Sequence, residues 1–250
     1  MSEGQLPDVV LRYADRTDAV VDLHLPDGAA SRRHVVVLLH GGFWKVEWDR
    51  THTRPLAREL AEDGWVVATP EYRRVGRGPG GGGGWPTTCA DVHDAVSALP
   101  RLVAERGVGA EPIRLVVAGH SAGGHLALWL ASSDLPIERV VPLAPVADLR
   151  EAARLGLGAH ATQAFMGGEP EQVDYRPADP VARFGVLRPR ASVRILHGTA
   201  DDVVPVSVSR SLQQAHPWVQ LEELEGIDHF EVIEPTSSAY AALRDALEGS

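Results

Sequence analysis

A serine between two glycines is the part of the sequence with the clearest chemistry. Ser121 stands in the segment Gly119-His120-Ser121-Ala122-Gly123, between the apolar run 113–118 and the helix-forming run 126–131. Glycines two residues to either side of the serine allow the sharp reversal of a nucleophile elbow, which exposes the hydroxyl at the tip of a strand–turn–helix unit. The first helical amide, that of Ala122, would point at negative charge developing beside the serine. The segment therefore predicts a nucleophilic serine.

A serine hydroxyl needs a base that takes its proton and an acid that orients this base. His229 follows the last predicted strand, where the base falls when the chain order is serine, acid, histidine. For the acid, Asp201 and Asp202 both follow the predicted strand that ends at His197. Asp148, after the preceding strand, is a third candidate, although an aspartate there can also cap a helix. The sequence therefore offers one base and three possible acids.

A double glycine offers the remaining part of such a site. His40-Gly41-Gly42 follows the apolar run 35–39. Amides of glycine can approach a tetrahedral oxyanion because no side chain intervenes. We expect the amides of Gly41, Gly42 and Ala122 to form an oxyanion hole. Residues next to these loops are expected to border the substrate, namely Phe43, Trp44, Trp85 and His120, and Trp48 belongs to the same group of aromatic side chains.

These segments lie at strand ends in an alternating pattern of strands and helices. Strands are predicted at 9–13, 19–25, 35–39, 65–69, 113–118, 139–143, 193–196 and 219–224, and helical stretches separate them from the third strand onwards. This alternation predicts an α/β fold with a mostly parallel central sheet, helices on both faces, and the site at one edge. Residues 148–190 interrupt the pattern. We expect a short lid insertion there, within a single domain over residues 1–250.

Composition limits the partners and the compartment. The chain of 250 residues is 44% hydrophobic and has a formal net charge of -10, so we expect a soluble globule without a nucleic-acid or membrane partner. No apolar stretch is long enough to span a bilayer. The single cysteine, Cys89, excludes an internal disulfide. Together with the polar start Met1-Ser2-Glu3-Gly4-Gln5, which lacks signal-peptide features, it predicts a cytoplasmic protein.

The chain resembles the α/β-hydrolases, and within them the kynurenine formamidase (arylformamidase) and hormone-sensitive-lipase-like esterase group. The resemblance extends from about residue 35 to the C-terminus, and its motifs occur in the family's order: His40-Gly41-Gly42-Phe43-Trp44, Gly119-His120-Ser121-Ala122-Gly123-Gly124-His125-Leu126, His197-Gly198-Thr199-Ala200-Asp201 with Val204-Pro205, and Asp228-His229-Phe230. It implies the α/β-hydrolase fold and favours Asp201 over Asp202 as the acid. The chain departs from the family at Phe43, where formamidases usually have tyrosine and the esterases a third glycine.

We therefore expect a serine hydrolase that forms an acyl-enzyme on Ser121 and acts on a small ester or an aryl formamide, without metal or cofactor. Its partner would be a small-molecule substrate. The alternative is a hydrolase-fold protein that binds a small ligand without turnover. Such proteins commonly lose the base or the acid, and this chain keeps candidates for both. A metal hydrolase built on His197, Asp201 and His229 is a weaker alternative because no compact ligand motif is present.

Overall fold

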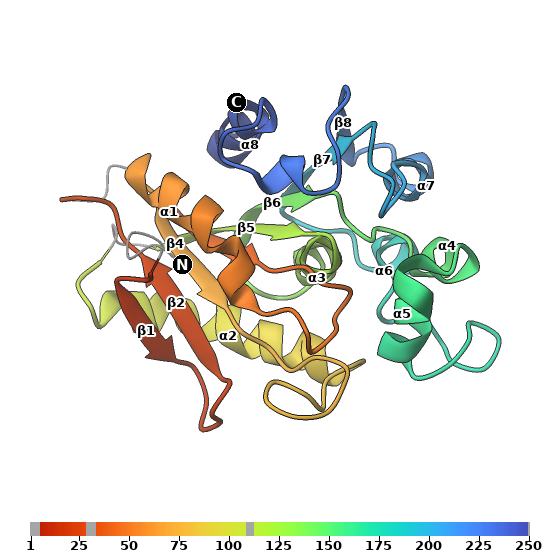
Figure 1. Cartoon of the computed structure of the whole chain (residues 1–250), viewed down its shortest axis with the longest axis horizontal. Helices are drawn as coiled ribbons and strands as arrows, with labels where there is room; N and C mark the ends of the chain where they lie inside the picture. The colour runs from red at the N-terminus through yellow and green to blue at the C-terminus, as the bar shows by residue number, and fades with distance from the viewer. Residues whose placement is uncertain (1–5, 29–33, 109–112, 250) are drawn as a thin grey trace.

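The computed structural model describes residues 6–28, 34–108 and 113–249. The expectation that no signal peptide is present rests on Met1–Gln5, and these residues lie outside the described part of the chain. The described chain forms one sheet of eight strands in the order β1-β2-β4-β3-β5-β6-β7-β8, with helices on both faces (Figure 1). The strands are β1 Val9–Arg12, β2 Val20–His24, β3 His34–Leu39, β4 Val66–Pro70, β5 Arg114–His120, β6 Ile137–Leu143, β7 Ser192–Gly198 and β8 Gln220–Leu224.

The sheet is parallel except at one side. β1 pairs antiparallel with β2, and β2 pairs antiparallel with β4. All pairs from β4 to β8 are parallel. The predicted α/β fold with a mostly parallel sheet is confirmed. Because the central strands are parallel, the loops that leave their carboxyl ends meet along one edge.

Helices cover both faces of the sheet. The helices outside residues 148–190 are α1 Arg54–Glu62, α2 Thr87–Ala104, α3 Ala122–Ala131, α7 Ser207–Ala215 and α8 Ala239–Glu248, and 3₁₀ turns occupy η2 Arg50–Thr53 and η3 Glu231–Ile233. Side chains of β3 alternate between the two faces, as expected for a strand covered on both sides. Val36 and Leu38 pack in the apolar cluster with α1 and α8, whereas Val35, Val37 and Leu39 pack in the cluster with α2 and α3.

The insertion predicted at residues 148–190 contains three short helices, α4 Leu149–Arg154, α5 Leu157–Met166 and α6 Pro180–Val186. Its largest apolar side chains do not face a substrate pocket. Phe165 and Tyr175 are buried members of the same core cluster as α2 and α3. The Phe165 ring also stacks on Trp44 with a centroid distance of 4.5 Å. The insertion is therefore joined to the main core.

Among the residues described above, no helix has the length and apolar character of a membrane span.

Candidate active site

Ser121 lies at the turn between β5 and α3, in a backbone conformation that side chains rarely adopt. Its φ is 55° and its ψ is -116°, a strained combination that persists only where the surroundings impose it. The flanking glycines explain how the chain tolerates this turn. A Cβ on Gly123 would lie 2.2 Å from the carbonyl oxygen of Leu39, and one on Gly119 would lie 2.3 Å from that of Gly123. The glycines are therefore required by the close approach of α3 to β3 and β5.

The base and acid candidates are joined directly. Nδ1 of His229, in the loop after β8, donates to Oδ2 of Asp201, after β7, at 2.6 Å. The other oxygen of Asp201 accepts the amides of Val203 and Val204 at 2.9 and 2.8 Å. Burial raises the pKa of Asp201, but hydrogen bonds from His197 and His229 outweigh burial and hold the pKa well below its usual range. Asp201 is therefore ionised, and Nε2 of His229 is left to accept a proton.

The other two acid candidates lie elsewhere. Asp202 is exposed, and Asp148 caps α4 by accepting the amide of Glu151 at 2.9 Å. The structure thus joins only Asp201, of the three, to His229.

His197 is a support for the acid loop. Its Nε2 lies 2.8 Å from the carbonyl of Val204, so this nitrogen carries the proton, and its Nδ1 accepts from the hydroxyl of Ser209 at 2.7 Å. Both nitrogens are engaged, which leaves no lone pair for a metal ion. In the part of the chain that the structure describes, no group of three or more His, Cys, Asp or Glu side chains is arranged to hold a metal.

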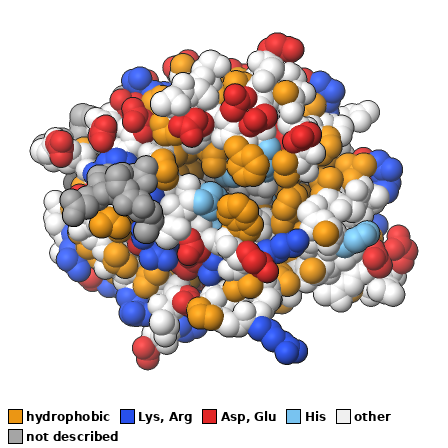
Figure 2. Space-filling view, in the orientation of Figure 1, with side chains coloured by type: hydrophobic (Ala, Val, Ile, Leu, Met, Phe, Trp, Pro, Cys, Tyr) orange, Lys and Arg blue, Asp and Glu red, His pale blue; other side chains and the backbone are white. Residues whose placement is uncertain are grey.

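Ser121 and His229 line the same pocket, a cavity of about 140 Å³. On this face of the molecule, hydrophobic side chains gather around histidines (Figure 2). The residues that line the cavity are Gly42, Phe43, Trp48, His52, His120, Ser121, Val203, His229 and Phe230. They come from the loops after β3, β5, β7 and β8, as the parallel sheet requires.

The double glycine lies against Ser121. A Cβ on Gly41 would be 3.2 Å from Cβ of Ser121, and Gly42 lines the cavity with a φ of 99°. Ala122 is the first residue of α3, so its amide has no acceptor within the helix. The double glycine thus approaches Ser121 from the loop after β3, and Ala122 follows Ser121 directly in the chain.

Of the residues expected to border the substrate, Phe43 and His120 line the cavity, and Trp44 and Trp85 do not. Trp44 is fully buried between Phe165 and His125, and Trp85 contacts Trp129 edge-on at 6.2 Å. The expectation for these two tryptophans is therefore corrected, because both are packing residues. Gly42, Phe43 and Trp44 all have positive φ, and this left-handed turn directs Phe43 to the cavity and Trp44 into the core.

His120 also supports the base. Its Nε2 donates to the backbone carbonyl of His229 at 2.8 Å, and the two rings lie 4.6 Å apart. Burial and the neighbouring His229 lower the pKa of His120 to about 3. A neutral ring with this fixed tautomer helps to position the loop that carries His229.

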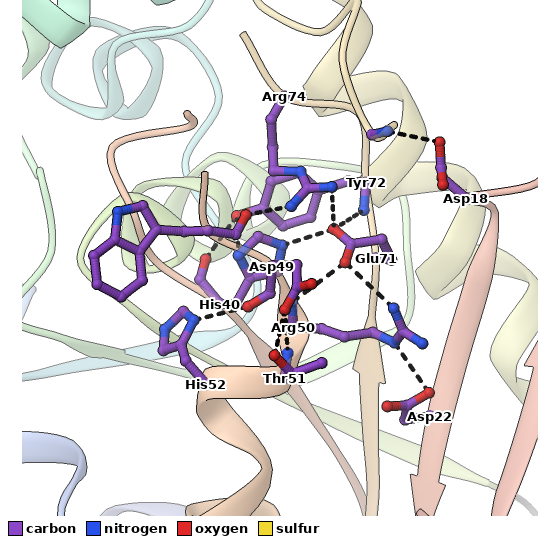
Figure 3. A network of polar contacts seen from close by, with 12 residues as sticks. Asp18, Asp22, His40, Asp49, Arg50, Thr51, His52, Glu71, Tyr72 and Arg74 are labelled. Carbon is purple, nitrogen blue, oxygen red and sulfur yellow. Dashed lines mark hydrogen bonds and ion pairs between the residues drawn. The ribbon is translucent and has the colours of Figure 1, made fainter. Parts of the chain in front are cut away.

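Trp48, which belongs to the aromatic group expected near the site, lines the cavity, and three further residues of the wall were not among the predicted ones: His52, Val203 and Phe230. Trp48 and Phe230 form an apolar rim, with exposed fractions of 47% and 55%. Nδ1 of His52 donates to the carbonyl of Asp49 at 2.8 Å, so in the neutral ring Nε2 is the acceptor. Burial and the nearby His40 lower the pKa of His52 to about 4. Its second nitrogen points away from Asp49 (Figure 3), which provides one polar acceptor in an apolar wall.

The chain is similar to a family model and to known esterases and a formamidase. A family model described as BD-FAE matches residues 21–216. Esterase LipQ of Mycobacterium tuberculosis is 26% identical over 208 residues, which cover 76% of this chain and 47% of that protein. Kynurenine formamidase of Danio rerio is 23% identical over 236 residues, which cover 89% of this chain and 74% of that protein.

The fold has close structural counterparts. The crystal structure of esterase B from Lactobacillus rhamnosis superposes with a TM-score of 0.79 at 19% identity, over 98% of this chain and 86% of that one. This likeness confirms the α/β-hydrolase fold. The chain spans about half the length of the mycobacterial relatives that it matches in sequence.

Proposed function

Because the chain belongs to the BD-FAE family, which matches most of its length, we propose that it is a serine hydrolase of small carboxylic esters. The observation that carries the proposal is the hydrogen bond of 2.6 Å between Asp201 and His229, at the wall of a cavity that also holds the strained Ser121. An ionised Asp201 bonded to His229 stabilises the imidazolium that forms during proton transfer, which a protein that only binds its ligand does not require.

The proposed reaction follows from the positions of the protons. The hydroxyl oxygen of Ser121 attacks the ester carbonyl, and its proton passes to Nε2 of His229. Asp201 stabilises the resulting imidazolium through the hydrogen bond to Nδ1. The amides of Gly42 and Ala122 donate hydrogen bonds to the tetrahedral oxyanion and stabilise its charge. His229 then protonates the departing alcohol, and the same residues, acting on water, release the acid from the acyl-enzyme.

The cavity supports a small, largely apolar substrate. Its volume of about 140 Å³ is close to the roughly 150 Å³ that admits a benzene molecule. Phe43, Trp48 and Phe230 supply flat apolar walls. These dimensions favour a short acyl chain or a single aromatic ring in this part of the site.

An aryl formamide is the second candidate. The acceptor nitrogen of His52 in the cavity wall favours it, because an anilide N–H is a donor that an ester lacks. The 23% identity to kynurenine formamidase is compatible with this chemistry. Phe43 replaces the tyrosine expected of formamidases, so the phenolic hydrogen bond of that motif is missing.

The test compares hydrolysis of p-nitrophenyl acetate and N-formylkynurenine by the wild type, Ser121→Ala, and Ser207→Ala as an exposed serine control. We expect turnover by the wild type and the control, and a loss of at least about 1,000-fold in Ser121→Ala. A higher kcat/KM for the formamide would select the second candidate. Full activity of Ser121→Ala would disprove the mechanism, and ligand binding without any turnover would favour the binding protein.

A further inference from the structure

A largely buried charged network surrounds Glu71 and includes His40, the residue before the double glycine (Figure 3). His40 directly follows β3 and Glu71 directly follows β4, so the parallel pairing of these strands brings the two side chains together. Both are buried, with exposed fractions of 0% and 3%. Nε2 of His40 lies 3.1 Å from Oε1 of Glu71, and Nδ1 lies 2.9 Å from the carbonyl oxygen of Gly41. One imidazole therefore connects a carboxylate to the oxyanion loop.

Both ring nitrogens of His40 face acceptors. A carbonyl and an ionised carboxylate cannot donate a proton. The hydroxyl of Tyr72, 3.3 Å from Nδ1, donates its own proton to the carbonyl of His40 at 2.6 Å. The Tyr72 ring stacks on the imidazole with a centroid distance of 4.1 Å and fixes its plane. Both contacts are hydrogen bonds only when both nitrogens carry protons.

Glu71 is held as the counter-charge. Burial raises its pKa, but His40 and Arg74 outweigh burial and place the pKa at about 2. Its second oxygen accepts the amide of Arg50 at 3.2 Å, and the Arg50 guanidinium lies 3.4 Å away. Arg50 in turn pairs with Asp22 at 3.0 Å. The oxygen that faces His40 also accepts the amide of Tyr72 at 3.1 Å and lies 3.5 Å from the guanidinium of Arg74, so the carboxylate is fixed from several sides.

The connection to catalysis passes through a single peptide group. The carbonyl of Gly41 and the N–H of Gly42 belong to the same peptide, and Gly42 lines the cavity beside Ser121. A charged hydrogen bond to the carbonyl shifts electron density toward oxygen and makes the N–H a stronger donor. It also fixes the orientation of the peptide before the substrate arrives.

We propose that Glu71 is a positioning residue for hydrolysis, which keeps His40 doubly protonated so that His40 orients and polarises the Gly41–Gly42 peptide of the oxyanion hole. This inference rests on the proposed function. Glu71 itself does not touch the substrate. Its effect is therefore expected on the stabilisation of the transition state, with little effect on ground-state binding.

The kinetic test uses Glu71→Gln, which keeps the size of the side chain and removes its charge. We expect kcat for p-nitrophenyl acetate to fall about tenfold with KM unchanged, which is less than the roughly 100- to 1,000-fold loss on deleting a donor. Affinity for trifluoroacetophenone, which mimics the tetrahedral intermediate, should fall by the same factor as kcat/KM. The matched control is Asp22→Asn, which removes another buried carboxylate of the network, one that does not contact His40.

The outcome depends on the contrast between the two variants. Both are expected to lower the unfolding temperature, and only Glu71→Gln should lower kcat. Equal losses of activity in both variants, or unchanged kcat in Glu71→Gln, would overturn the proposal and leave Glu71 with a structural role.

A spectroscopic measurement on the wild type covers the case in which Glu71→Gln does not fold. In ¹⁵N spectra recorded at the pH of the kinetic assay, both ring nitrogens of His40 should be protonated, and a single protonated nitrogen would refute the proposal. This readout does not depend on turnover. Failure of the proposed function would appear separately, as full activity of Ser121→Ala.

Discussion

Replacing Asp179 by asparagine is expected to stabilise the protein at alkaline pH. Asp179 is 2% exposed and caps α6, and its Oδ1 accepts the amides of Leu149 and Val181 at 3.2 and 3.4 Å. It lies near a second buried carboxylate, Asp148, which accepts the hydroxyl of Ser211 at 2.5 Å. Burial and the charge of Asp148 raise the pKa of Asp179 from 3.8 to about 7.

The sign of the effect follows from linkage. Below pH 3.8, Asp179 is protonated in both the folded and the unfolded chain, and it costs nothing. Between pH 3.8 and about 7, the unfolded chain loses this proton and the folded chain keeps it, so the free energy of unfolding falls as the pH rises. At 1.36 kcal/mol per pH unit, the loss reaches up to about 4 kcal/mol above pH 7.

Asparagine keeps the acceptor oxygen and cannot ionise, and it caps helices about as well as aspartate. The assay is urea unfolding followed by tryptophan fluorescence at about pH 5 and about pH 8.5, with the exposed Asp202→Asn as control. Because other groups also titrate, the informative quantity is the difference between variant and wild type. The free energy of unfolding of Asp179→Asn, relative to that of the wild type, should be on the order of 2 to 4 kcal/mol higher at about pH 8.5 than at about pH 5. An equal difference at both would refute the argument, since Asp179 would then ionise as an ordinary carboxyl.

Three further predictions concern the site and its scaffold. Asp201→Asn should lower kcat by roughly 10,000-fold with little change in KM, because an amide no longer fixes the tautomer of the base; steady-state kinetics on p-nitrophenyl acetate tests it. Gly123→Ala should prevent folding or cost several kcal/mol of unfolding free energy, since its Cβ would lie 2.2 Å from the carbonyl of Leu39. Thermal unfolding of Gly123→Ala measures this loss, and Gly185→Ala is the control because its Cβ would meet nothing within 4 Å. His52→Phe should lower kcat/KM for N-formylkynurenine more than for p-nitrophenyl acetate, and equal losses would contradict a hydrogen bond to the formamide N–H.

The sheet and the segment around Ser121 could be predicted from sequence because local rules determine them. An apolar strand, two glycines and a helix-forming run leave few alternatives to a sharp turn. The same holds for Asp201 and His229, each of which follows a parallel strand, so that the topology alone brings their loops to one edge.

The residues of the cavity wall were harder to predict, because side-chain direction in loops depends on backbone torsions. The positive φ values of Gly42, Phe43 and Trp44 reverse the alternation that an extended segment would give. Trp44 is therefore buried where an aromatic wall was expected. Trp48 and His52, a few residues further on, line the cavity instead.

The sequence gives little indication that His40 and Glu71 form a pair. An acidic residue directly after an apolar strand is usually solvated, and only the neighbouring position of β3 and β4 in the sheet shows that this one meets a histidine. Pairing of parallel strands depends on the whole topology and cannot be deduced from one motif.

The half-exposed rim of the cavity has a consequence for how substrate preference can change. Trp48 and Phe230 bound the entrance yet contribute little to the buried core, whereas Ser121 and its flanking glycines are confined by backbone contacts. Substitutions of Trp48 or Phe230 can therefore change which substrates enter the cavity with little effect on the free energy of unfolding. Substrate selectivity and fold stability depend on different residues of one small cavity, so each property can change among related chains independently of the other.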